Sequence, residues 1–121
     1  MTVGKLWSVT LDCDDPEKLA AFWAEMLGGK VAYTSDKFVG VELETGTWIG
    51  AYQIPDYQRP SWPDGEPPKQ FHLDLSVEDL DAAESAAVDL GATKAEHQPE
   101  PDRWRVLLDP VGHPFCLTNM S

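Results

Sequence analysis

One stretch of sequence just past the middle of the chain decides the fold. Residues 71–76 read Phe71-His72-Leu73-Asp74-Leu75-Ser76. Apolar and polar side chains alternate along it, which is the pattern of a strand with one buried and one polar face. Residues 7–12 have the same alternation and read Trp7-Ser8-Val9-Thr10-Leu11-Asp12. The later stretch therefore repeats an earlier strand, and Ser8 corresponds to His72.

The repeat continues beyond these two strands. Asp15 and Asp79 each follow a strand as the N-cap of a helix, and Leu-Gly pairs at residues 27–28 and 90–91 end the two helices. Further on, a turn ending at Gly46 precedes one strand, and a turn ending at Gly112 precedes another. This order of shared features predicts two βαβββ halves.

The pattern places eight strands and two helices. The helices are expected from Pro16 to Leu27 and from Leu80 to Leu90, with Leu19, Phe22, Trp23 and Met26 and then Leu80, Ala83, Ala87 and Leu90 facing inward. The strands are expected at residues 5–12, 30–34, 38–43, 47–53, 71–76, 93–97, 104–108 and 115–119. The predicted fold class is α+β.

Length and charge restrict the classes of function. A chain of 121 residues is long enough for one domain, with a first module at about residues 1–54, a linker at 55–69 and a second module at about 70–121. A formal net charge of −12 argues against nucleic acid and anionic membrane surfaces as partners. Without an apolar run or a secretion signal, a cytoplasmic protein is expected. Cys13 and Cys116 match no metal-binding spacing and are expected to be reduced.

Aromatic residues give the best indication of a ligand site. If Ile49 and Ala51 face the core, Trp48, Gly50 and Tyr52 face the other way, on the side of Ser8 and His72. The proline-rich linker carries Tyr57 and Trp62. These two aromatic residues are expected either to cover a ligand cleft or to pack on the surface of the domain or of a partner subunit.

These residues together resemble a known superfamily. The resemblance rests on Asp15-Pro16 before a helix with Ala-Phe-Trp, on residues 71–75, on Leu90-Gly91-Ala92, on Trp104 and on Asp109-Pro110-Val111-Gly112-His113-Pro114-Phe115-Cys116-Leu117. The chain is similar to the vicinal oxygen chelate superfamily, and specifically to its small glyoxalase-like and bleomycin-resistance-like proteins. The resemblance implies paired βαβββ modules with curved mixed sheets around a cleft, and commonly a homodimer. Whether each cleft forms within one chain or between two chains stays open.

The resemblance also implies positions for a metal, which this sequence fills poorly. Superfamily enzymes take one ligand from the first and one from the last strand of each module, and these positions fall on Ser8, Gly50, His72 and Cys116. Only His72 matches the usual His, Gln or Glu. Because a catalytic zinc site usually has about three protein ligands, neither a metal nor another cofactor is expected.

Two functions from different classes remain, beside a non-catalytic scaffold. The first is binding of a small aromatic or cationic molecule, as in drug-sequestering resistance proteins, in a cleft in an acidic protein. The expected ligand-binding residues are Ser8, Phe38, Trp48, Gly50, Tyr52, Trp62, Trp104 and Cys116. The alternative is a lyase, isomerase or cyclase that uses His72 as an acid or base, with Asp74 and Glu42 nearby.

Overall fold

Each half of the chain folds into one helix and a four-stranded mixed sheet. The computed structural model describes residues 2, 4–70 and 72–119. The first unit, residues 1–57, contains β1 (Ser8–Cys13), α1 (Pro16–Leu27), β2 (Lys30–Thr34), β3 (Phe38–Glu42) and β4 (Trp48–Gln53). The second unit, residues 58–121, contains β5 (Leu73–Ser76), α2 (Leu80–Leu90), β6 (Thr93–Lys94), β7 (Trp104–Leu108) and β8 (Pro114–Thr118). The linker segment therefore divides after residue 57, and most of it belongs to the second unit.

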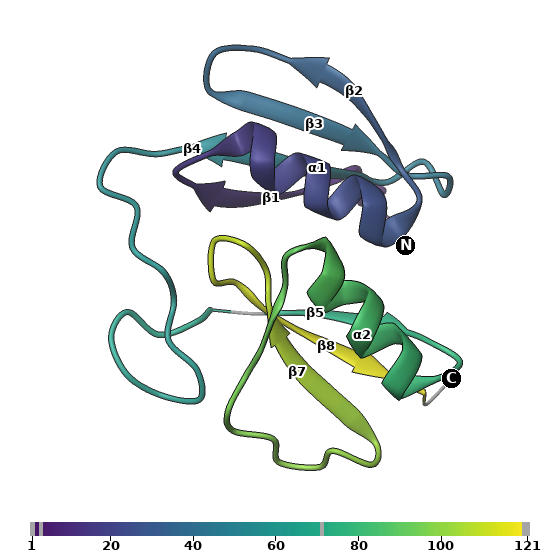
Figure 1. Ribbon diagram of the computed structural model, residues 1–121. Helices are drawn as coiled ribbons and strands as arrows, with labels where there is room; N and C mark the ends of the chain where they lie inside the picture. The colour runs from purple at the N-terminus through teal and green to yellow at the C-terminus, as the bar shows by residue number, and fades with distance from the viewer. Residues whose placement is uncertain (1, 3, 71, 120–121) are drawn as a thin grey trace. The chain divides into compact units, whose positions relative to one another are not determined.

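The two sheets have the same topology, as the repeat predicts (Figure 1). Their strand orders are β1-β4-β3-β2 and β5-β8-β7-β6. In each sheet the first strand runs parallel to the last, and the remaining neighbours are antiparallel. This confirms the α+β class with two βαβββ modules.

Capping side chains start both helices where the sequence predicts. Asp15 accepts a hydrogen bond from the Lys18 amide at 3.2 Å, and Asp79 accepts one from the Ala82 amide at 3.0 Å. Each bond satisfies a backbone donor that has no partner within the helix. Neither helix is long and apolar enough to cross a membrane in the part of the chain that the structure describes.

Each helix packs on one face of its sheet. In the first unit, Leu19, Phe22 and Trp23 are buried, and the rings of Phe22 and Trp23 meet edge to face at 5.1 Å. In α2, Leu80 and Ala87 are buried as predicted. The prediction is wrong for Leu90, which is 40% exposed, because it is the last residue of the helix.

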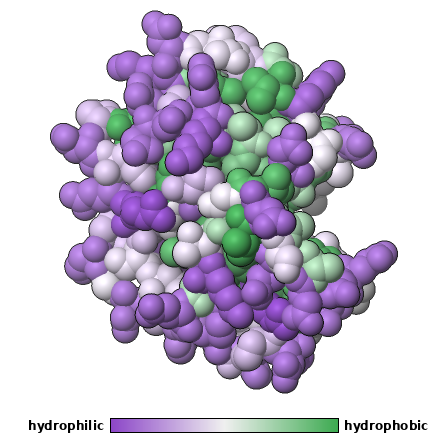
Figure 2. All heavy atoms as spheres, in the orientation of Figure 1, coloured by the Kyte–Doolittle hydropathy of each residue, from purple (hydrophilic) through white to green (hydrophobic). Residues whose placement is uncertain are grey.

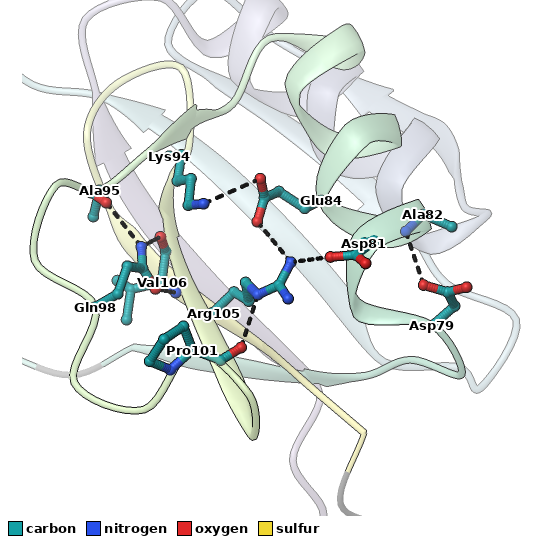
Figure 3. A network of polar contacts seen from close by, with 10 residues as sticks. All are labelled: Asp79, Asp81, Ala82, Glu84, Lys94, Ala95, Gln98, Pro101, Arg105 and Val106. Atoms are coloured by element: carbon teal, nitrogen blue, oxygen red, sulfur yellow. Dashed lines mark hydrogen bonds and ion pairs between the residues drawn. The ribbon is translucent and has the colours of Figure 1, made fainter.

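An ion-pair network ties α2 to β7 on this face of the second sheet (Figure 3). Arg105 Nη1 lies 2.7 Å from a carboxylate oxygen of Asp81 and 3.1 Å from one of Glu84. Lys94 lies 3.5 Å from Glu84. Hydrogen bonds to these two carboxylates raise the pKa of Arg105, so its charge is fixed.

The strand boundaries differ from the predictions where a pairing partner ends. The first strand begins at residue 8 rather than 5, because the pairing with β4 starts at Ser8 opposite Trp48. The predicted strand at 71–76 is observed from Leu73, and Phe71 lies outside the described residues. Three further strands differ from the predicted ranges by one residue at a boundary. They span residues 38–42, 48–53 and 114–118.

The strand predicted at residues 93–97 is shorter for a different reason. It spans Thr93–Lys94, and the Gln98 side chain then bonds the neighbouring backbone. Gln98 Nε2 donates to the carbonyls of Ala95 and Val106 at 2.8 Å each, and Oε1 accepts from the Val106 amide at 2.9 Å (Figure 3). A side chain therefore satisfies backbone groups that a longer strand would pair.

Candidate functional site

The predicted site residues of the first unit lie together on one face of its sheet. Val39, Val41, Ile49 and Ala51 are buried on the face that packs against α1. Because side chains alternate along a strand, their neighbours lie on the opposite face. We call this surface the first helix-free face: Ser8, Thr10, Asp12, Lys30, Tyr33, Phe38, Gly40, Glu42, Trp48, Gly50 and Tyr52.

Two glycines let aromatic rings lie close to the strands on the first helix-free face. Gly40 and Gly50 are directly opposite each other in β3 and β4. A Cβ atom added to Gly50 would lie 2.6 Å from Phe38 Cε1, and one added to Gly40 would lie 2.9 Å from the Trp48 ring. Tyr33 extends this group, with its ring centroid 6.1 Å from that of Phe38. Gly50 is therefore a position where a side chain would displace an aromatic ring.

Two carboxylates lie beside the aromatic residues of the first helix-free face. Glu42 is directly opposite Trp48, and Asp12 is directly opposite Tyr52. Glu42 Oε1 lies 3.9 Å from Lys30 Nζ, and the Lys30 side chain is 77% exposed whereas that of Glu42 is 41% exposed. Tyr33 and Tyr52 are 55% and 43% exposed, so aromatic surface remains accessible. Aromatic faces beside carboxylates suit a flat molecule with a positive charge.

The second sheet also has a face that α2 does not cover. We call it the second helix-free face: Asp74, Val106, Cys116, Trp104 and Thr118, together with Ala95. Ala95, Val106 and Cys116 form a buried apolar cluster, against which Trp62 and Trp104 pack. Of the two expectations for Trp62, the structure therefore shows packing on a sheet of its own unit. Tyr57, the other aromatic residue of the linker, is half-buried in the first unit.

His72, Asp74 and Cys116 form a short chain of polar contacts at the edge of the second helix-free face. His72 Nε2 lies 3.2 Å from Asp74 Oδ1. Cys116 is directly opposite Asp74 in the parallel pairing of β5 and β8. Burial, and then the charge of Asp74 and a hydrogen bond to it, raise the pKa of the Cys116 thiol to about 11. The thiol is therefore protonated at neutral pH and is not a ready nucleophile.

These three residues form a group that could hold a metal ion within the described part of the chain. One ligand atom from each of His72, Asp74 and Cys116 lies within 4.8 Å of the others. A nitrogen, an oxygen and a sulfur donor do not fit manganese, which prefers oxygen-rich sites, but they are a set that zinc accepts. At the other two expected ligand positions, Gly50 has no side chain and Ser8 lies in the first unit. Within the second unit, the three donors His72, Asp74 and Cys116 thus fit zinc better than manganese.

The sequence predicted part of each face and missed the other members. Tyr33 was not expected on the first helix-free face, because an irregularity between Val31 and Tyr33 changes which side chains point to that face. Thr10 and Gly40 were also missed, although the alternation that selected Ser8 and Phe38 selects them as well. On the second helix-free face, Val106, Thr118 and Ala95 were missed, and Ala95 lies just beyond the observed strand Thr93–Lys94.

Comparisons with known proteins agree with this architecture. A family model described as a glyoxalase-like domain matches residues 8–118. No curated protein matches the chain. A glyoxalase/bleomycin resistance protein/dioxygenase family enzyme from Burkholderia phytofirmans PsJN is 21% identical, with a TM-score of 0.74 over 98% of this chain and 100% of its own.

Two solved fosfomycin resistance proteins named FosX are also similar in structure. The one from Mesorhizobium loti is 17% identical, with a TM-score of 0.74 over 99% of this chain and 94% of its own. A mutant from Listeria monocytogenes, complexed with Mn(II) and 1S,2S-dihydroxypropylphosphonic acid, is 19% identical, with a TM-score of 0.73 over 99% of this chain and 95% of its own. At these identities the likeness concerns the fold. With the family match over residues 8–118, this chain belongs to the glyoxalase-like domain family.

Proposed function

We propose that this protein binds a small, flat, positively charged organic molecule on the first helix-free face, without a metal ion. The observation that carries the proposal is the group of aromatic rings around Gly40 and Gly50. Trp48 and Phe38 offer ring surface for stacking, and Tyr33 and Tyr52 offer exposed ring edges or faces. Such groups anchor flat ligands with little loss of side-chain entropy.

Charge favours a cationic ligand over an anionic one. Glu42 and Asp12 lie in register with Trp48 and Tyr52, and the whole chain has a formal net charge of −12. Hydrophilic residues cover most of the surface seen in Figure 2, with apolar patches between them. The phosphonic acid in the Listeria FosX structure is an anion, so we propose a different ligand class for this protein.

Isothermal titration calorimetry with N-methylacridinium tests the proposal, with uncharged acridine at alkaline pH as the matched probe. We expect Trp48→Ala to weaken binding of N-methylacridinium by about tenfold, since stacking and cation–π contacts together contribute about 1–2 kcal/mol. His72→Ala should leave the affinity unchanged, because His72 is not one of the residues of the first helix-free face. Equal affinities of wild type and Trp48→Ala would refute the proposed site.

A second candidate function is acid–base catalysis at His72. The contact of 3.2 Å between His72 Nε2 and Asp74 Oδ1 favours it, because a carboxylate can orient a histidine for proton transfer. In this case a turnover assay with a panel of small electrophilic substrates would lose activity in His72→Ala. Trp48→Ala would retain the rate of the chemical step. The two variants thus separate binding from catalysis.

A further inference from the structure

Trp62 comes from outside the βαβββ repeat yet packs against the second helix-free face. It lies in the linker segment, before β5, and is half-buried against the cluster of Ala95, Val106 and Cys116. Its indole Nε1 donates a hydrogen bond to the carbonyl of His97 at 3.2 Å. Lys69 lies 5.3 Å from the centre of the ring. One indole therefore makes an apolar contact, a hydrogen bond and a cation–π contact at the same place.

The two helix-free faces have matching positions in their sheets. Val106 and Cys116 pair as Gly40 and Gly50 do. Trp104, two residues before Val106, holds the position that Phe38 holds two residues before Gly40. Both units therefore place an aromatic side chain at the same point of the same face, and Trp62 adds a second ring in the second unit.

The segment that carries Trp62 is held at points other than the indole. Arg59 Nη1 donates to the Pro110 carbonyl at 3.2 Å, in the turn between β7 and β8. The Ser61 amide donates to the Pro67 carbonyl at 2.7 Å and closes a small loop. Asp64 and Glu66 within that loop are exposed. The backbone can thus keep its anchors when the ring is removed.

We propose that the second helix-free face is a binding site for a flat aromatic ring with an N–H donor. In the ligand-free protein, the indole ring of Trp62 occupies this site. The His97 carbonyl accepts the N–H group, the cluster of Ala95, Val106 and Cys116 packs against the ring, and a competing ligand of indole type must displace Trp62. All of the residues named for this site lie in the second unit.

Indole is the probe, and the variant is Trp62→Ala. The two cysteine thiols, which form no disulfide, serve as reporters, since Cys116 belongs to the buried cluster of this face and Cys13 is fully buried in the first unit. Labelling with N-ethylmaleimide at one fixed pH, followed by peptide mass spectrometry, measures the two rates separately. We expect the Cys116 rate to rise at least tenfold in Trp62→Ala, with the Cys13 rate unchanged. Saturating indole should return Cys116 to its slow rate.

Several results would overturn this proposal. An unchanged Cys116 rate, or a rate that indole does not slow, would mean that Trp62 covers no ring site. Parallel rises at Cys13 and Cys116 would mean that Trp62 is an ordinary core residue whose loss unfolds the chain. Trp7→Ala is the matched control, because Trp7 is 72% exposed and its loss should alter neither rate.

Arg59→Ala gives a second test that keeps the indole in place. Without the contact to the Pro110 carbonyl, the loop should release Trp62 more often. We expect a smaller rise of the Cys116 rate, which free indole again suppresses. A Cys116 rate equal to that of the wild type would count against displacement of Trp62.

Discussion

At the scale of single residues, Gly50 determines the shape of the first helix-free face. A Cβ atom at this position would lie 2.6 Å and 2.8 Å from two atoms of the Phe38 ring and 2.9 Å from Thr10 Oγ1. These distances are shorter than real Cβ contacts allow, so a neighbour must move. The absence of a side chain at Gly50 therefore leaves room for the Phe38 ring.

Gly50→Ala should therefore destabilise the protein and weaken ligand binding together. We expect a loss of about 1–3 kcal/mol in the free energy of unfolding, which is the usual cost of overpacking, measured by urea denaturation. Gly4→Ala is the control, because a Cβ atom there would meet nothing within 4 Å. Equal stabilities of Gly50→Ala and wild type would show that Phe38 is free to shift.

Cys116 gives a prediction about pH. Its folded-state pKa is raised from 9.0 to about 11, so the folded protein binds the thiol proton more tightly than the unfolded chain does. This contribution to stability is fully present below pH 9 and is lost as the pH rises from 9 to about 11. Unfolding free energy measured across this range should fall more steeply for wild type than for Cys116→Ala. Identical slopes would contradict the raised pKa.

At the scale of elements, one residue of β7 connects the second sheet to its helix. Arg105 is 16% exposed and contacts both Asp81 and Glu84, whereas Lys94 is 48% exposed and contacts Glu84 (Figure 3). Arg105 Nε also donates to the Pro101 carbonyl at 2.8 Å. Arg105, the more buried of the two cations, therefore connects β7 to α2 and to the turn that precedes β7.

Arg105→Ala should cost more stability than Lys94→Ala. We expect a loss of about 1–2 kcal/mol for Arg105→Ala, because a partly buried charge network and its hydrogen bonds are broken. Lys94→Ala should cost less than about 0.5 kcal/mol, as is usual for an exposed pair. Thermal and urea unfolding measure both values. A larger loss for Lys94→Ala would contradict this ranking.

The elements themselves were largely predictable from the sequence. Asp15 and Asp79 mark the helix starts, and Gly46 and Gly112, with φ of 92° and 95°, occupy the matching turns of the two repeats. The irregularity beside Tyr33 and the hydrogen bonds of Gln98 were not predictable, because they depend on how neighbouring strands pair. The packing of Trp62 on the second sheet depends likewise on contacts distant in sequence.

At the scale of the whole molecule, charge should govern the choice of ligand. A formal net charge of −12 attracts cations over a distance of about 10 Å at moderate ionic strength. Raising the salt concentration should therefore weaken binding of N-methylacridinium severalfold and leave that of neutral acridine unchanged. Equal salt dependence in calorimetric titrations would show that charge does not contribute to recognition.

The homodimer that the family resemblance implies is our proposal for the assembled protein. Sedimentation velocity should then give twice the mass of one chain at micromolar concentration. The mass of a single chain under the same conditions would contradict it. Neither result alters the assignment of the ligand to the first helix-free face.

Binding of a flat cation on β3 and β4 can be measured by a residue-resolved NMR titration with N-methylacridinium. We expect saturable shifts that are largest at the amides of residues 38–42 and 48–52 and at the indole N–H of Trp48. The largest shifts at residues 72–76 and 114–118, or shifts that do not saturate, would contradict it.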